Sequence, residues 1–117
     1  MELSFEPLGG GITLAKLSGR LDLAGSRAID LPFTAHVATQ STRVVVDLSQ
    51  VSFLASLGIR VLVVPAKAAR ARGGDLVLLN PQPKVMEVLM VSGLTAVLKV
   101  YTDLAEAVAA LSAPAAR

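Results

Sequence analysis

Residues 45–62 read VVDLSQVSFLASLGIRVL, and this stretch indicates the fold more strongly than any other part of the chain. The valine run at 44–46 predicts a strand that is buried on both faces, as a central strand of a parallel sheet is. A short apolar piece then leads to Ser56, and a helical pattern follows. We therefore expect a strand over 43–48 and a helix over 57–72.

Outward from this stretch, strand and helix patterns alternate along the chain. Residues 2–6 and 12–18 alternate polar and apolar side chains, as half-buried strands do, and the glycines between them predict a hairpin turn. Further strands are expected at 75–79 and 98–101, and further helices at 24–39, 82–92 and 103–111. The order β-β-α-β-α-β-α-β-α predicts an α/β fold, with a mixed sheet of about five strands and about four helices packed on it.

Two features interrupt this pattern. Residues 19–22 predict a break after the second strand, and Pro32 lies inside the helical pattern of 24–39. Since an internal proline removes a helix hydrogen bond, we expect a kink there or a helix that begins later. A single domain over 1–112 is expected, followed by a flexible C-terminal tail at 113–117.

Composition excludes several classes of function. The chain has no cysteine, which rules out disulfides and thiolate metal sites, and its formal net charge is only +2. Lys67, Arg70 and Arg72 predict a solvated helix face and not a nucleic-acid site, which needs a denser basic surface. No apolar run approaches the ~20 residues of a membrane span, and the N-terminus does not resemble a signal peptide. We expect a cytoplasmic protein with no membrane insertion.

Residues suited to catalysis are few. His36 is the single histidine, and no pattern pairs it with a nucleophile. The glycines at 9–11 precede a strand and not a helix, so they do not form a phosphate-binding loop. The carboxylates show no metal-ligand spacing, and Asp75 is interpreted as a turn residue that starts a strand. We therefore expect a protein that is not an enzyme and that needs no cofactor or metal.

Ser56 precedes the predicted helix and has two interpretations. Its hydroxyl is suited to act as the N-cap of that helix. It is also suited to phosphorylation, because a helix N-terminus attracts anions and a phosphate there would change which surface can dock.

The same stretch resembles the signature of the STAS domain family, in which a strand ending in Asp-Leu-Ser precedes Asp-Ser-Ser/Thr-Gly-Leu at the start of a helix. Gly19-Arg20-Leu21-Asp22 is similar to the family's Gly-x-Leu-Asp, and Gly73-Gly74 to its Gly-Gly turn. Pro83, Gly93-Leu94 and Glu106-Ala107 match the spacing of its later helices. The likeness covers nearly the whole chain and implies the STAS (SpoIIAA-like) fold.

The resemblance is to the family's anti-sigma-factor antagonists. It implies binding to an anti-sigma factor that is also a serine protein kinase, in a partner-switching system that frees a sigma factor and so regulates transcription. Phosphorylation of one serine breaks the complex, a phosphatase restores it, and that serine aligns with Ser56. The partner-binding residues implied by the resemblance are Asp22, Ala55, Ser56, Leu57, Gly58 and Arg60.

Three residues depart from the family pattern. Ala55 replaces the aspartate before the serine, Leu57 replaces the following Ser/Thr, and Arg60 stands where the family often has glycine. The site is therefore less polar than usual, and Leu57 is a candidate apolar anchor for a partner. Two alternatives stay open: a non-phosphorylatable scaffold, and an accessory subunit of a lipid ABC transporter.

Overall fold

The computed structural model describes residues 1–40 and 42–112, and the predicted tail at 113–117 lies outside them. The elements follow in the order β1 (Glu2–Gly9), β2 (Ile12–Leu21), α1 (Leu23–Thr39), β3 (Arg43–Leu54), α2 (Ser56–Ala71), β4 (Asp75–Leu79), α3 (Pro83–Val91), η1 (Leu94–Ala96), β5 (Val100–Tyr101) and α4 (Leu104–Ser112). This order confirms the predicted one and adds the short 3-10 helix η1.

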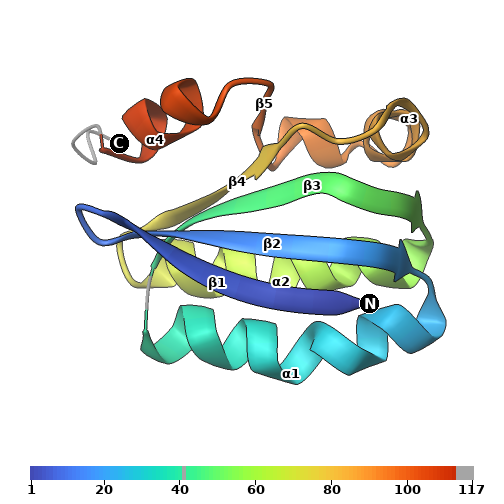
Figure 1. The fold of residues 1–117 in the computed structure, drawn as a ribbon, viewed down its shortest axis with the longest axis horizontal. Helices are drawn as coiled ribbons and strands as arrows, with labels where there is room; N and C mark the ends of the chain where they lie inside the picture. The colour runs from blue at the N-terminus through green and yellow to red at the C-terminus, as the bar shows by residue number, and fades with distance from the viewer. Residues whose placement is uncertain (41, 113–117) are drawn as a thin grey trace.

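The strands form one mixed sheet in the order β1-β2-β3-β4-β5 (Figure 1). β1 and β2 run antiparallel, and the remaining neighbours run parallel. Gly9, Gly10 and Gly11 make the tight turn between β1 and β2 with φ angles of 85°, 64° and 77°. Glycine adopts this left-handed backbone without steric cost, so the predicted hairpin is confirmed.

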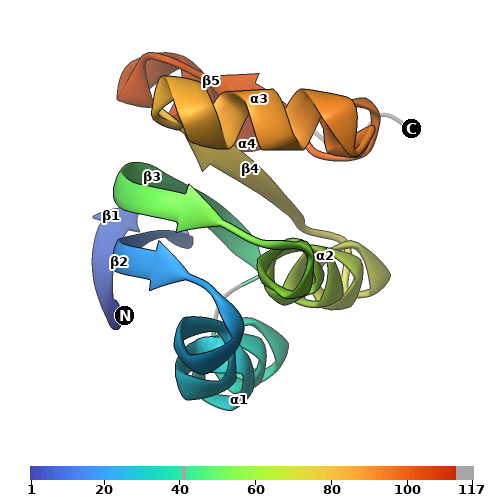
Figure 2. The same ribbon diagram turned by 90° about the vertical axis from the view of Figure 1, so that its right-hand side faces the viewer.

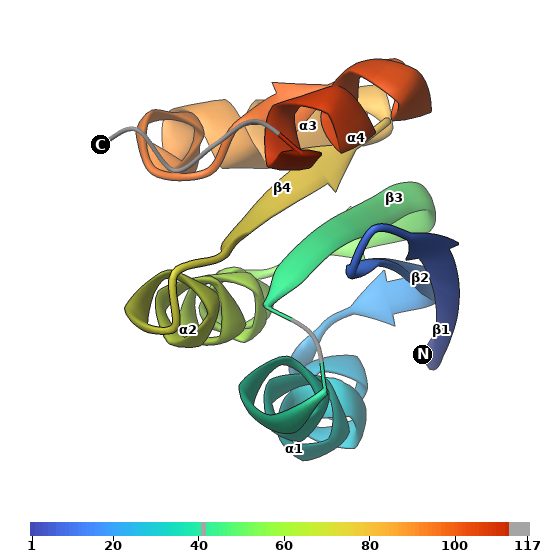
Figure 3. The ribbon, with the colours of Figure 1, turned by 90° about the vertical axis from the view of Figure 1, so that its left-hand side faces the viewer.

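The central strand β3 is buried on both faces, as the valine run predicted. Val44 and Val46 belong to a large core that α1, α2 and α3 share with one face of the sheet. Val45 belongs to a smaller core on the other face, where α4 supplies Ala107 and Leu111. Figures 2 and 3 show α1 and α2 together on one side of the sheet, with α3 and α4 near its β4–β5 edge.

The predicted break at 19–22 and the predicted end of β3 at residue 48 are both wrong. β2 continues through Gly19, which has a φ of 118°, and ends at Leu21. β3 continues through the apolar piece and ends at Leu54, so Leu21 and Leu54 are partners across the two parallel strands. The ladder between neighbouring strands overrides the local signals, and register shifts absorb the irregular residues.

Helix α1 begins at Leu23 and runs through Pro32, so the alternative of a later start is wrong. Asp22 caps its first turn, and the Pro32 side chain is exposed. The ring therefore disturbs no core contact, and the cost of the proline is limited to its missing hydrogen bond and local crowding. Over residues 1–40 and 42–112, no helix combines the length and apolar character needed to cross a bilayer.

Candidate functional site

The candidate site lies where β2 and β3 end side by side. Both strands run in the same direction, so the residues after Leu21 and Leu54 emerge at one edge of the sheet (Figure 2). The backbone N–H of Ala55 donates to the carbonyl oxygen of Leu21 across 3.0 Å. This hydrogen bond holds the start of α2 beside the start of α1.

Ser56 is exposed at the first position of α2. The N-cap is Ala55, with extended backbone angles and no side chain able to accept a hydrogen bond, so the N-cap interpretation of Ser56 is wrong. Within the described residues, the Ser56 hydroxyl makes no hydrogen bond to the protein. It is therefore free to meet solvent or another molecule.

The first amides of α2 are only partly satisfied. The N–H groups of Gly58 and Ile59 donate to the Ala55 carbonyl oxygen, at 2.9 and 3.3 Å. The amides of Ser56 and Leu57 have no acceptor in the described part of the chain. Unpaired amides and the helix dipole give this end of α2 a positive potential, which favours a negative group near Ser56.

Asp22 contributes a carboxylate to the same edge and is also a structural residue. Its Oδ1 accepts a hydrogen bond from the Gly25 N–H at 2.8 Å, and its Oδ2 lies 3.6 Å from Nε of Arg20. The backbone hydrogen bond from Gly25, followed by the nearby Arg20 charge, lowers the pKa of Asp22 below its ordinary value of 3.8. Asp22 is thus ionised at neutral pH and caps α1.

Arg20 and Phe53 join this edge although neither was predicted as a site residue. They are partners across β2 and β3, and the Arg20 guanidinium lies 4.3 Å from the centroid of the Phe53 ring. The Phe53 side chain nevertheless stays 39% exposed. An exposed aromatic ring beneath a cation offers both apolar area and charge to a partner.

A groove of about 570 Å³ opens beside Ser56, between the start of α2 and helix α3. Phe53, Ser56 and Ile59 line one side, and α3 supplies Lys84, Val88 and Val91. Val91 is 83% exposed, which is unusual for a large apolar residue on a folded surface. The groove is therefore an apolar trough with Ser56 and Lys84 at its margin.

Leu57 and Arg60 face a different place. They line a smaller depression of about 230 Å³ between α1 and α2, together with Arg27 and Asp30 of α1. Leu57 is half-buried there, so it only partly offers the exposed apolar anchor that we expected. The predicted partner-binding residues thus divide between two sides of α2.

Gly58 is buried and contributes by packing. A Cβ atom at this position would come within 2.7 Å of Leu54 Cδ1 and 2.8 Å of the Leu21 carbonyl oxygen. Contacts this short do not occur between real side chains and their neighbours, so α2 can approach β2 and β3 only with glycine here. Gly58 therefore sets the position of Ser56 against the strand ends.

His36 lies far from these residues along α1. Its ring stacks on Phe5 with centroids 3.7 Å apart, and burial lowers its pKa. The half-buried His36 ring therefore packs at the edge of the core through Phe5. In the described ranges, no three His, Asp or Glu side chains gather as a potential metal site.

The comparisons with known proteins agree with the architecture and with the motif at residues 45–62. The model of the STAS domain family matches residues 9–107, and this chain belongs to that family. BtrV of Bordetella bronchiseptica, a protein named as an anti-sigma factor antagonist, is 33% identical over 100 residues, covering 86% of each chain.

Two solved structures of the anti-sigma factor antagonist SpoIIAA have the same fold. The unphosphorylated form superposes with a TM-score of 0.76 at 24% identity, covering 92% of this chain and 93% of SpoIIAA. The phosphorylated form, from Bacillus, gives a TM-score of 0.70 at 23% identity, covering 93% and 98%. At these identities the likeness shows the shared fold.

Proposed function

We propose that this chain is an anti-sigma-factor antagonist that acts by binding, without catalysis of its own. Its partner is a cytoplasmic anti-sigma factor that is also a serine kinase, and Ser56 is the residue that this kinase phosphorylates. The observation that carries the proposal is the exposed Ser56 hydroxyl, which has no partner in the described residues and stands at the margin of an apolar groove. The relative BtrV, named for the same activity, supports the proposal.

The groove supports a docking role for this edge. Phe53 and Val91 expose apolar area that a partner would cover, and buried apolar area is the main source of binding free energy. The groove margin carries charge of both signs, because Lys84 and Glu87 both line it and the Arg20 guanidinium over Phe53 lies 3.6 Å from Asp22. A partner segment with an exposed apolar side chain would match this surface.

Phosphorylation would work as a switch through charge. A phosphate on Ser56 brings between about −1.5 and −2 charges at neutral pH. Burying that charge beneath an apolar partner carries a large desolvation cost, so the complex would dissociate. The departures from the family pattern do not remove the hydroxyl, and Ala55 leaves the first amides of α2 open to the phosphate. A phosphatase would then return the chain to its binding form.

The test uses the intact chain and a serine-kinase anti-sigma factor from the same genome. Incubation with ATP, followed by mass spectrometry, should find one phosphate, and that phosphate should be on Ser56. Calorimetry should show binding by the unmodified chain, and Ser56→Asp should weaken it at least tenfold, a loss of about 1.4 kcal/mol.

Ser92→Asp is the matched control, because Ser92 lines the same groove and is exposed. The same charge there should weaken binding less than it does at Ser56. Unmodified Ser56 together with no complex would contradict the proposal. Binding without phosphorylation, unaffected by Ser56→Asp, would favour the non-phosphorylatable scaffold, and co-purification with a transporter ATPase would favour the transporter subunit.

A further inference from the structure

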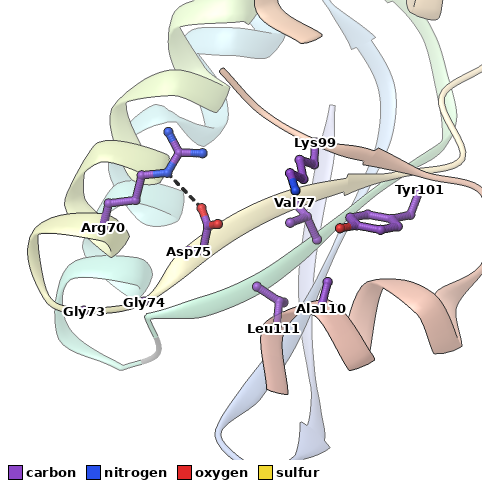
Figure 4. A pocket seen from close by; sticks show the side chains of 9 residues that line it. All are labelled: Arg70, Gly73, Gly74, Asp75, Val77, Lys99, Tyr101, Ala110 and Leu111. Carbon is purple, nitrogen blue, oxygen red and sulfur yellow. Dashed lines mark hydrogen bonds and ion pairs between the residues drawn. The ribbon is translucent and has the colours of Figure 1, made fainter. Parts of the chain in front are cut away.

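A second cavity lies at the opposite end of the parallel strands from Ser56. It occupies about 780 Å³ between the start of β4, the residues around β5 and the last turn of α4 (Figure 4). This volume falls within the range of roughly 300–1,000 Å³ that small-molecule sites occupy. Ser56 follows the carboxyl end of β3, whereas this cavity borders Asp75 at the amino end of β4, so the two places are separate.

Two polar groups point into this cavity without a partner. Figure 4 shows the Lys99 ammonium and the Tyr101 hydroxyl both turned toward Val77. Neither group makes a hydrogen bond or an ion pair within residues 1–40 and 42–112. Lys99 is exposed and is solvated there, whereas a half-buried tyrosine hydroxyl usually finds a partner, so Tyr101 beside this cation is open to a group from outside.

The acidic residue at the rim is already neutralised. Oδ1 of Asp75 accepts hydrogen bonds from Arg70 Nε and from the Leu76 N–H, each at 2.8 Å. The same guanidinium donates to the Val97 carbonyl oxygen at 2.6 Å, which fixes it in place. The Arg70 and Asp75 charges therefore cancel, and the positive charge that remains in the cavity belongs to Lys99.

The floor of the cavity is apolar. Val77 and Leu111 form it and are only 3% and 5% exposed, so the apolar surface that a ligand can reach comes from the half-buried Tyr101 ring and from half-buried Ala110 on α4 (Figure 4). A free inorganic anion would leave the Tyr101 ring and Ala110 uncovered, whereas a molecule with a short hydrocarbon body would cover them.

We propose that this cavity binds a small organic carboxylate. The carboxylate pairs with the Lys99 ammonium and accepts a hydrogen bond from the Tyr101 hydroxyl, and the hydrocarbon body lies against the Tyr101 ring and Ala110. The site is independent of the function proposed above, since it shares no residue with the Ser56 groove.

The test is a titration of the full chain followed by ¹⁵N NMR, with hexanoate, 1-hexanol and inorganic phosphate as three probes. Hexanoate should shift the amides of Val77, Lys99 and Tyr101 saturably, and the other two probes should bind more weakly. Lys99→Gln, which keeps an exposed side chain of similar length, should weaken hexanoate binding about tenfold, and Tyr101→Phe about fivefold. Lys84→Gln, in the distant groove, should leave it unchanged.

Several results would overturn the assignment. Equal hexanoate affinity in the wild type and in Lys99→Gln would show that the Lys99 ammonium does not bind the carboxylate. If hexanol bound as tightly as hexanoate, the site would not recognise a carboxylate. If phosphate bound more tightly than hexanoate, the site would not recognise a hydrocarbon body. Shifts confined to the Ser56 groove, or no saturable shift at all, would exclude the cavity.

Discussion

Asp22 shows how one side chain serves both the fold and the surface. Its carboxylate caps α1 through Gly25 and lies beside Arg20, and both contacts stabilise its ionised form. Because its pKa is lowered in the folded chain, the stabilisation it provides is fully present above the unfolded value of 3.8. That stabilisation is lost as the pH falls through the lower, folded value.

Asp22→Asn should reduce the acid sensitivity of the protein. Asparagine caps helices about as well as aspartate, so urea unfolding at pH 7 should give nearly the same free energy of unfolding as the wild type. Between pH 7 and pH 3, the variant should lose less stability, because it has no carboxylate to protonate at this position. Asp30→Asn, on the exposed side of α1, is the control. If the pH dependence were the same in Asp22→Asn as in the wild type, protonation of Asp22 would make no contribution to the pH dependence of the free energy of unfolding.

The first turn of α2 has no side-chain N-cap. Ala55 occupies the N-cap without a side-chain acceptor, and the amides of Ser56 and Leu57 point out unpaired in the described structure. A side chain with an oxygen at residue 55 could accept a hydrogen bond from this turn.

Ala55→Asp should therefore stabilise the isolated chain. A capping aspartate is worth roughly 0.5–2 kcal/mol relative to alanine, and the charge also interacts favourably with the helix dipole. Ala55→Ser, a cap without charge, should give a smaller gain. Urea unfolding at neutral pH measures both differences. Equal stability of all three chains would mean that water already satisfies these amides as well as a side chain does.

At the scale of elements, the sequence predicted the order and type of almost every segment, and it failed where strands met. The periodic patterns of β1, α2 and β4 are local and survive in the fold. The extension of β2 past Gly19 depends on pairing with β3, more than twenty residues away. Helix α1 keeps Pro32 because its buried face and its Asp22 cap outweigh one missing hydrogen bond.

The whole molecule contains two cores of unequal size. α1, α2 and α3 share the larger core, whereas α4 rests on the smaller one through Ala107 and Leu111. A helix held by fewer buried contacts should open without unfolding the rest of the chain.

Native-state hydrogen exchange should detect this opening. The amides of α4, such as that of Leu111, should exchange at a lower free energy and with a weaker denaturant dependence than the amide of Leu62 in α2. As a control, Leu62→Ala in the larger core should reduce global stability by roughly 2–5 kcal/mol and so speed exchange throughout α2. Identical free energies and slopes in the two helices would mean that the molecule opens only as a unit.

At the same scale, the candidate site was only half accessible to sequence reasoning. The family resemblance grouped Ser56 with Asp22, and in the structure both follow parallel strands that end side by side. The α3 side of the groove was missed, since nothing near Lys84 or Val91 in the chain shows that α3 folds beside Phe53. The sequence offered one indication of this side of the groove. α3 has more apolar residues than its core-facing side can bury, and Val91 is one that stays exposed.

Tyr101 is the single tyrosine of a chain that has no tryptophan. Tyrosine emission from this protein therefore originates at one ring, and that ring lines the cavity beside Lys99. A solute that contacts the ring or its hydroxyl should alter the intensity of this emission. The intrinsic fluorescence of the chain therefore reports on binding at the cavity beside Lys99 and not on binding at the groove beside Ser56.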